Sequence, residues 1–190
     1  KVNNVVNRFT GNWASYNFDD IIGVSLPIKK TIDLAKKIAT ETAPVLISGE
    51  IGIGKEVFAQ AIHNASVRSE NGFVKISLQS IPQNEMDCEL FGFEEGVFPG
   101  IKKAAQPGKF ELAHGGSLYL DEVDNLTLDL QDKLLSAIRK GVIMRVGGNK
   151  PIKVDVRVFA ASSKDLRTLI HEGKFRLDLF YILTENPLMI

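Results

Sequence analysis

The sequence predicts an α/β fold in which a parallel sheet is flanked by helices. Short apolar runs that suit buried strands alternate along the chain with segments whose apolar residues recur at helical spacing. Turn residues, mainly glycine, proline and asparagine, separate the two kinds of segment. Strands that alternate with helices are typical of parallel sheets with right-handed crossovers. The 190 residues are enough for one large domain or for a fragment of a larger protein.

The first predicted helix begins after Ser25, which suits the N-cap position, and has Pro27 in its first turn. Its apolar face consists of Ile28, Ile32, Ala35 and Ala39. Further helices are predicted at 55–65, 86–91, about 130–141 and 164–171. The predicted strands are 44–48, 73–77, 117–120 and 156–161.

Two segments between these elements differ from the rest. Glycines and prolines are dense over 92–108, which predicts a long loop. Over 142–156, the pair Gly147–Gly148 separates two extended stretches, which predicts a hairpin.

Composition and charge exclude several classes of protein. Apolar residues make up 44% of the chain and charged residues 24%, as in ordinary soluble domains, which excludes a disordered or collagen-like chain. Lys plus Arg and Asp plus Glu are both 23, so no overall charge draws the domain to DNA or to an anionic membrane. Cys88 is the single cysteine, which excludes an internal disulfide and favours a reducing compartment. No apolar run reaches membrane-spanning length and no secretory signal is present, so the sequence predicts a cytoplasmic protein.

Residues 1–17 show neither helical nor strand periodicity and predict a linker or an arm that packs on a neighbouring surface. The chain begins with Lys1 rather than Met, which predicts that it is a fragment of a longer protein.

The sharpest local motif lies between the first predicted strand and the helix that follows it. It reads Gly49, Glu50, Ile51, Gly52, Ile53, Gly54, Lys55 and Glu56. In this setting the glycines let the loop curl so that its N–H groups can bind phosphate, the helix start favours an anion, and Lys55 can reach the outer phosphates. The strict pattern ends in Ser or Thr, whose hydroxyl binds magnesium, and here Glu56 stands in that place, so this ligand is absent. The alternative is a glycine-rich turn with a chance lysine.

A second motif ends the strand at 117–120 with two carboxylates, Asp121 and Glu122. Ligands of parallel sheets lie at the carboxyl ends of the strands, so this pair is expected beside the glycine-rich loop. Asp121 would then hold Mg²⁺, directly or through water, and Glu122 would orient an attacking water. The alternative is an exposed acidic turn that caps the next helix.

With these motifs and several others in order, the chain from Phe18 to its last residue resembles the central ATPase domain of bacterial enhancer-binding proteins, the NtrC-like AAA+ activators of sigma-54 RNA polymerase. The family loop typically reads Gly-Glu-x-Gly-x-Gly-Lys-Glu, so Glu56 is normal there. Further matching segments lie at 18–23, 89–94, 107–113, 115–116, 146–148 and 173–176.

The resemblance implies a P-loop domain at 18–190 with a five-strand sheet, ATP and Mg²⁺ as ligands, and the hairpin as an insertion facing the pore of a hexameric or heptameric ring. It also implies that Ile21, Ile22 and Gly23 line the adenine pocket. Arg176 matches an arginine that reaches the nucleotide of the neighbouring subunit. The family's small helical lid would follow Ile190, where this chain stops.

Some positions depart from the family pattern. The loop that engages sigma-54 reads Gly-Ala-Phe-Thr-Gly-Ala in the family, and here it reads Gly96, Val97, Phe98, Pro99, Gly100 and Ile101. Pro99 lacks a hydroxyl and an N–H group, which argues against engagement of sigma-54. Ser77 stands where the family usually has an asparagine that couples the catalytic glutamate to the sensor loop. Ser163 stands where it has the sensor asparagine, and Ile182 where it has a second arginine.

Two functions follow from this pattern. The first is an ATPase that oligomerises and regulates transcription initiation, with Lys55, Asp121, Glu122 and Arg176 in the roles given above, and with DNA contacted by another domain. The alternative is a degenerate module that binds nucleotide to control oligomerisation but does not remodel sigma-54 polymerase.

Overall fold

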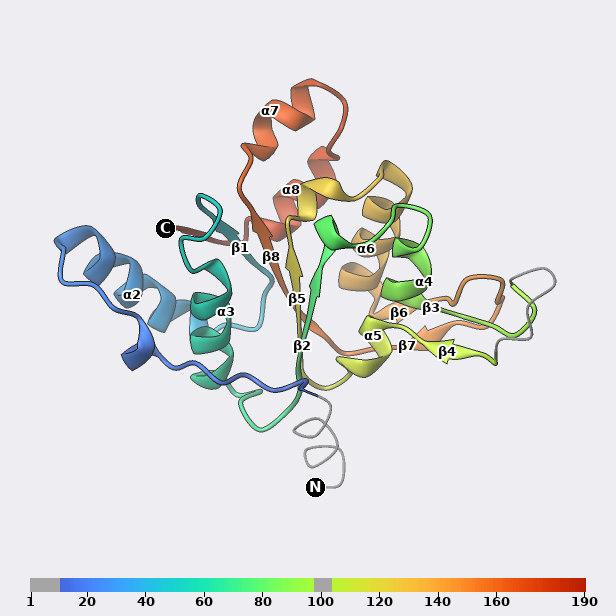
Figure 1. Cartoon of the computed structure of the whole chain (residues 1–190), viewed down its shortest axis with the longest axis horizontal. Helices are drawn as coiled ribbons and strands as arrows, with labels where there is room; N and C mark the ends of the chain where they lie inside the picture. The colour runs from blue at the N-terminus through green and yellow to red at the C-terminus, as the bar shows by residue number, and fades with distance from the viewer. Residues whose placement is uncertain (1–10, 98–103) are drawn as a thin grey trace.

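A five-stranded parallel sheet forms the centre of the molecule (Figure 1). The computed structural model describes residues 11–97 and 104–190. Across the sheet the strands are β2 (Phe73–Ser77), β5 (Ser117–Asp121), β8 (Arg157–Ser162), β1 (Val45–Ser48) and β9 (Asn186–Met189). Every neighbouring pair is parallel. This arrangement confirms the predicted α/β class, the four strands expected from apolar runs and the fifth implied by the resemblance.

Helices cover both faces of the sheet. The longer ones are α2 (Leu26–Ala39), α3 (Lys55–Asn64) and α6 (Leu128–Lys140). The shorter ones are α4 (Met86–Phe91), α5 (Lys109–Leu112), α7 (Leu166–His171) and α8 (Leu177–Leu183), with 3-10 turns η1 (Phe18–Asp20), η2 (Leu78–Ser80) and η3 (Val123–Asn125). Figure 1 shows α2 and α3 on one side of the sheet and α4, α6 and α8 on the other.

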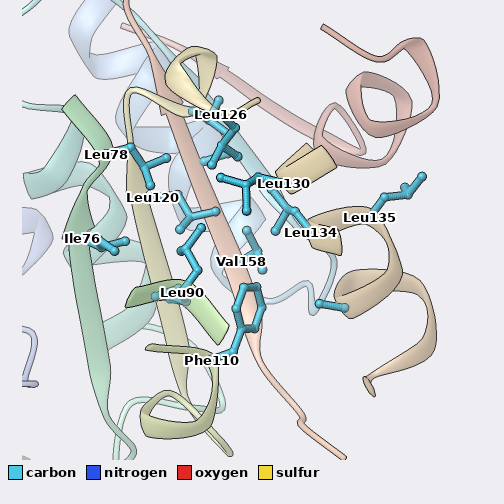
Figure 2. Close-up of a cluster of buried hydrophobic side chains, with 14 of the residues drawn as sticks. Ile76, Leu78, Leu90, Phe110, Leu120, Leu126, Leu130, Leu134, Leu135 and Val158 are labelled. Atoms are coloured by element: carbon cyan, nitrogen blue, oxygen red, sulfur yellow. The ribbon is translucent and has the colours of Figure 1, made fainter. Parts of the chain in front are cut away.

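Two apolar clusters lie on the two faces because successive strand residues point in opposite directions. In β5, Leu118 and Leu120 face the larger cluster, whereas Tyr119 faces the smaller one, formed with α2 and α3. The same alternation divides β8, where Val158 belongs to the larger cluster and Phe159 to the smaller. Figure 2 shows the larger cluster, in which residues of α6 approach those of β5 and β8. The three inner strands β5, β8 and β1 are buried on both faces, which explains why they read as continuous apolar runs.

The helix ends follow local rules. The Ser25 hydroxyl accepts a hydrogen bond from the Ile28 N–H of α2, and Thr127 accepts one from Leu130 at the start of α6. Gly141 ends α6 with a left-handed backbone (φ 61°), which glycine adopts without steric cost.

The segment at 92–108 is not entirely a loop as expected. Its two ends form a short antiparallel pair, β3 (Gly92–Phe93) with β4 (Gln106–Pro107). A Cβ atom at Gly108 would overlap the backbone at Gly92, so the close approach of these glycines permits the pairing. The predicted hairpin is present as β6 (Val142–Ile143) with β7 (Ile152–Lys153).

The described part of the N-terminal arm lies against α3. The buried amide of Gln60 accepts a hydrogen bond from the Ser15 N–H at 2.7 Å. The Asn64 side chain donates to the carbonyl oxygens of Ala14 and Tyr16. Within the described residues no helix is long and apolar enough to cross a membrane.

Candidate nucleotide-binding site

The glycine-rich loop joins β1 to α3 at the carboxyl edge of the sheet. Gly52 and Gly54 have positive φ angles of 80° and 101°, so the loop curls in a way that L residues rarely allow. Gly54 directly precedes Lys55, the first residue of α3. The unpaired N–H groups at the start of this ten-residue helix therefore face the loop, as a phosphate-binding site requires.

Lys55 lies under this loop, with only 6% of the residue exposed. Its ammonium donates hydrogen bonds to the carbonyl oxygens of Gly49 at 2.9 Å and Glu50 at 3.0 Å. Its Nζ atom also lies 3.4 Å from Oε1 of Glu122. The loop and the carboxylate that follows β5 therefore meet at one ammonium group, although 67 positions separate the two side chains along the chain.

Glu122 has a left-handed backbone, with φ 55° and ψ 59°. Among the described residues it is the only non-glycine residue with a positive φ. Such a conformation is strained for a side chain with a Cβ atom and tends to occur at functional sites. Oε2 of this carboxylate accepts hydrogen bonds from the N–H of Ser163 at 3.0 Å and from its hydroxyl at 2.8 Å.

Asp121 ends β5 one residue earlier. Its Oδ1 atom accepts a hydrogen bond from the hydroxyl of Tyr119 at 3.0 Å. Its other oxygen, Oδ2, makes no hydrogen bond within the described residues. The carboxylate is therefore anchored on one side and available on the other.

These groups surround a cavity of about 250 Å³. It is lined by Ile51, Gly52, Gly54, Lys55, Glu56, Gln79, Tyr119, Asp121 and Glu122. An ammonium group and curled main-chain amides on one side, opposite two carboxylates, suit a phosphate chain that carries a divalent cation.

The donors present fit Mg²⁺ bound together with a nucleotide. Within the described chain no group of three or more His, Cys, Asp or Glu side chains could hold a metal by itself. Mg²⁺ typically takes one or two carboxylates and completes its shell with phosphates and water. Asp121 can supply such a carboxylate. Glu56 is already engaged, because its Oε1 accepts hydrogen bonds from Gln60 at 2.7 Å and from Lys75 at 2.9 Å.

A second polar cluster supports the turn that carries Glu122. The carboxylate of Asp124 pairs with Lys164 at 2.7 Å and accepts a hydrogen bond from the Ser162 hydroxyl at 2.9 Å. Burial raises the pKa of Asp124, but these two partners outweigh it and hold the pKa below its usual value. An ionised Asp124 thus ties the turn after β5 to the end of β8.

A larger cavity of about 440 Å³ adjoins the other side of the loop. It is lined by residues at the ends of β1, β8 and β9 and by α7 and α8, including Gly49, Glu50, Ser163, Lys164 and Ile190. Gly49, Glu50 and Ser163 touch groups of the first site, so the two cavities flank the same loop.

The residues expected to contact adenine lie in a separate place. Ile21 packs against the smaller apolar cluster, Ile22 is 98% exposed, and a Cβ atom at Gly23 would contact Ile28 at 2.8 Å. None of the three lines either cavity beside the loop.

Arg176 does not join the site within its own chain. Its guanidinium pairs with Asp178 at 2.8 Å and with Asp132 at 3.1 Å, and it lines a separate polar cavity of about 730 Å³. The buried side chain of Gln131 accepts a hydrogen bond from the Arg176 N–H at 2.8 Å and donates to the carbonyl oxygens of Leu126 and Lys174, both at 2.9 Å. A fully bonded amide therefore fixes the backbone that carries this arginine.

Of the expected sigma-54 loop, Phe98, Pro99, Gly100 and Ile101 lie outside the described residues. Val97, in the described part of this loop, lies against Gly147 in the turn between β6 and β7, because a Cβ atom at Gly147 would overlap the side chain of Val97. Ser77 ends β2 in register with Asp121. Its side chain makes no hydrogen bond to Glu122 in the described structure, and Ser163 fills that role instead.

The sequence interpretation missed Tyr119 and Gln131. Tyr119 could have been found from its spacing, because residues two apart in a strand share a face, and Asp121 lies two positions after it. No local signal marks Gln131, whose partner Arg176 is 45 positions away.

Comparisons with known proteins identify the family of the chain. A family model described as the sigma-54 interaction domain matches residues 21–189. The chain belongs to this family. A signal-transduction and transcriptional-control protein of Clostridium beijerinckii is 47% identical over 189 residues, which cover 100% of this chain and 30% of that protein.

Solved structures resemble this sigma-54 interaction domain as well. NtrX from Brucella abortus, crystallised in complex with ATP, superposes with a TM-score of 0.83 at 34% identity, over 98% of this chain and 39% of NtrX. The P-loop NTPase domain of an E. coli sigma-54 activator superposes with a TM-score of 0.60 at 16% identity, over 88% of this chain and 96% of that one, which supports the fold alone. The fold is that of an AAA+ P-loop NTPase. The chain spans about a third of the length of its curated relative and of NtrX.

Proposed function

We propose that this chain binds ATP with Mg²⁺ and hydrolyses it, as the AAA+ domain of a longer bacterial regulator of transcription initiation. The observation that carries the proposal is the distance of 3.4 Å between Nζ of Lys55 and Oε1 of Glu122. It brings a phosphate-binding ammonium and a water-orienting carboxylate to one cavity, which is what phosphoryl transfer to water needs. NtrX, a relative of similar structure, was crystallised with ATP and with ADP.

In this proposal each group has a defined task. The loop N–H groups and Lys55 bind the β- and γ-phosphates, and Lys55 exchanges the carbonyl oxygens of Gly49 and Glu50 for phosphate oxygens. Asp121 would hold Mg²⁺, which would neutralise phosphate charge when bound. Glu122 orients and polarises a water that attacks the γ-phosphate, and ADP leaves. For Ile21, Ile22 and Gly23 to contact the adenine, the base would have to extend beyond both cavities beside the loop, since none of the three lines them.

We assign Arg176 a role in trans. It does not line its own chain's site and is partly exposed, so it can reach a neighbouring copy by exchanging its ion pairs with Asp132 and Asp178 for phosphate. A guanidinium from the next subunit would stabilise charge on the transferring phosphoryl group. Such head-to-tail contacts generate a ring, here of six or seven copies.

The test compares nucleotide binding and phosphate release in four variants. We expect Lys55→Ala to abolish ATP binding, and Glu122→Gln to keep binding while losing at least a hundredfold in turnover. The matched controls are Lys30→Ala and Glu70→Gln, which remove charges of the same kind at exposed positions. Equal turnover in the wild type and in Glu122→Gln would refute the assignment.

One observation favours the second function, a nucleotide-binding module with weak or no turnover. Ser163 binds one oxygen of Glu122 and Lys55 lies beside the other, so both oxygens are occupied before a water could be oriented. In that function nucleotide occupancy would control oligomerisation without remodelling sigma-54 polymerase. Phosphate release that rises steeply with protein concentration would exclude it.

The family and the relatives support a cytoplasmic regulator whose DNA contacts are made by another domain. Binding of sigma-54 factor is the natural partner interaction for this family, and Pro99 argues against a strong one. A pull-down with purified sigma-54 factor, with the nucleotide site filled by ADP–aluminium fluoride, tests this directly.

A further inference from the structure

The side chain of Tyr119 connects the apolar layer of the fold to the candidate site. Its ring belongs to the cluster between α3 and the sheet and is stacked on Phe73 with ring centroids 6.2 Å apart. The residue is 2% exposed, yet it lines the cavity of about 250 Å³ beside the glycine-rich loop. Packing therefore fixes the ring and leaves its hydroxyl at the site.

This hydroxyl has one hydrogen-bond partner in the described structure, the Oδ1 atom of Asp121 at 3.0 Å. A carboxylate oxygen can only accept a hydrogen bond, so the Tyr119 hydroxyl is the donor in this contact. Because the donor is held by a rigid ring, it restricts rotation of the Asp121 side chain.

We propose that Tyr119 is a positioning residue that orients Asp121 for binding of the divalent cation that accompanies the nucleotide. The hydrogen bond occupies Oδ1 and leaves Oδ2, which makes no hydrogen bond within the described residues, to bind the cation or its water. The proposal rests on the proposed function, because it assigns a role within the same site.

A merely structural role would give a different outcome. If Asp121 only satisfies a buried hydroxyl, loss of the hydroxyl changes the free energy of unfolding but not the affinity for the cation. If the hydroxyl orients Asp121, the loss weakens cation binding and leaves nucleotide binding without metal unchanged. The two roles are thus separated by a measurement on the metal.

The experiment uses Tyr119→Phe, which keeps the ring and removes the hydroxyl. The matched control is Tyr16→Phe, an exchange of the same kind at an exposed position. Binding of a fluorescent ATP analogue is measured in EDTA. The affinity for Mn²⁺ is then measured by electron paramagnetic resonance on the protein saturated with adenylyl imidodiphosphate.

We expect Tyr119→Phe to bind the analogue in EDTA within twofold of the wild type and to bind Mn²⁺ about three- to tenfold more weakly. In an Asp121→Ala background the same exchange should have no further effect on Mn²⁺. Tyr16→Phe should match the wild type in both measurements.

Unchanged Mn²⁺ affinity with intact nucleotide binding would overturn this inference alone. A loss of nucleotide affinity in EDTA would also overturn it, since Tyr119 would then act on the loop rather than on Asp121. A wild-type protein that binds no nucleotide would contradict the proposed function, and this inference with it.

Discussion

Ser163 holds the carboxylate of Glu122 with two hydrogen bonds to Oε2, one from its N–H at 3.0 Å and one from its hydroxyl at 2.8 Å. Ser163 directly follows β8 and Glu122 directly follows β5, and these strands are neighbours in the sheet. The end of one strand therefore fixes the side chain at the end of the next. Both bonds go to Oε2, so within the described residues the other carboxylate oxygen, Oε1, is engaged only by Lys55 at 3.4 Å.

Removal of the Ser163 hydroxyl should loosen this contact. Since the N–H bond remains in Ser163→Ala, we expect basal ATP turnover to rise about two- to fivefold while the affinity for ATP stays unchanged. Steady-state phosphate release measures the effect, with Ser15→Ala as an exposed control. A fall in turnover would show instead that the Ser163 hydroxyl assists hydrolysis.

Arg176 provides a test of action between subunits. Arg176→Ala should retain ATP binding and lose most of its turnover, because the site would lack the guanidinium of its neighbour. A mixture of Arg176→Ala and Lys55→Ala, each inactive alone, should regain activity, since one copy supplies the nucleotide site and the other supplies the arginine. A mixture as inactive as its components would place Arg176 outside catalysis.

Gln131 should matter for stability through its three hydrogen bonds. In Gln131→Leu, the carbonyl oxygens of Leu126 and Lys174 and the N–H of Arg176 lose their partner in the interior. We expect the free energy of unfolding to fall by about 2–4 kcal/mol, as measured by urea denaturation. Replacement of exposed Gln83 by Leu, which leaves no buried group unpaired, should change it by less than about 0.5 kcal/mol.

His63 should make stability depend on pH. Nε2 lies 3.3 Å from the carbonyl oxygen of Asn71, which can only accept, so this nitrogen carries the proton and Nδ1 accepts from the Ser117 hydroxyl. Burial, assisted by the charges of Arg157 and Arg68, lowers the pKa of His63 to about 4.

In the unfolded chain the pKa of a histidine is about 6.5, so below that pH the unfolded state binds a proton that the folded state does not. Stability is therefore full above pH 6.5 and falls by about 1.4 kcal/mol per pH unit as the pH decreases toward 4. The measurement is the difference in unfolding free energy between the wild type and His63→Gln at pH 7 and pH 4. A difference that is constant over this range contradicts the prediction.

Much of the fold could be predicted from the sequence, because β1, β5 and β8 are buried on both faces and read as apolar runs, and the edge strand β2 is still mostly apolar although it exposes Lys75. The fifth strand, Asn186–Met189, contains a proline and an exposed methionine at the sheet edge, so composition does not reveal it. The seven-residue helix α8 is almost wholly apolar, and a short run of that kind does not distinguish a helix from a strand.

Part of the candidate site could also be predicted from the sequence. The position of Lys55 near Glu122 follows from the rule that ligands gather at the carboxyl ends of parallel strands. Ser163 and Glu122, which are joined by hydrogen bonds, lie 41 positions apart in the sequence. The left-handed backbone of Glu122 depends on the tertiary structure around it. Neither leaves a local trace in the sequence.

The left-handed backbone of Glu122 affects which substitutions this position tolerates. Glycine would relieve the strain there, of the order of 1–2 kcal/mol, and asparagine would tolerate it better than glutamate does. Either replacement would also leave the N–H and hydroxyl of Ser163 and the buried ammonium of Lys55 without this carboxylate, at a cost of similar size. Stability alone therefore gives this position no strong preference for or against the acid.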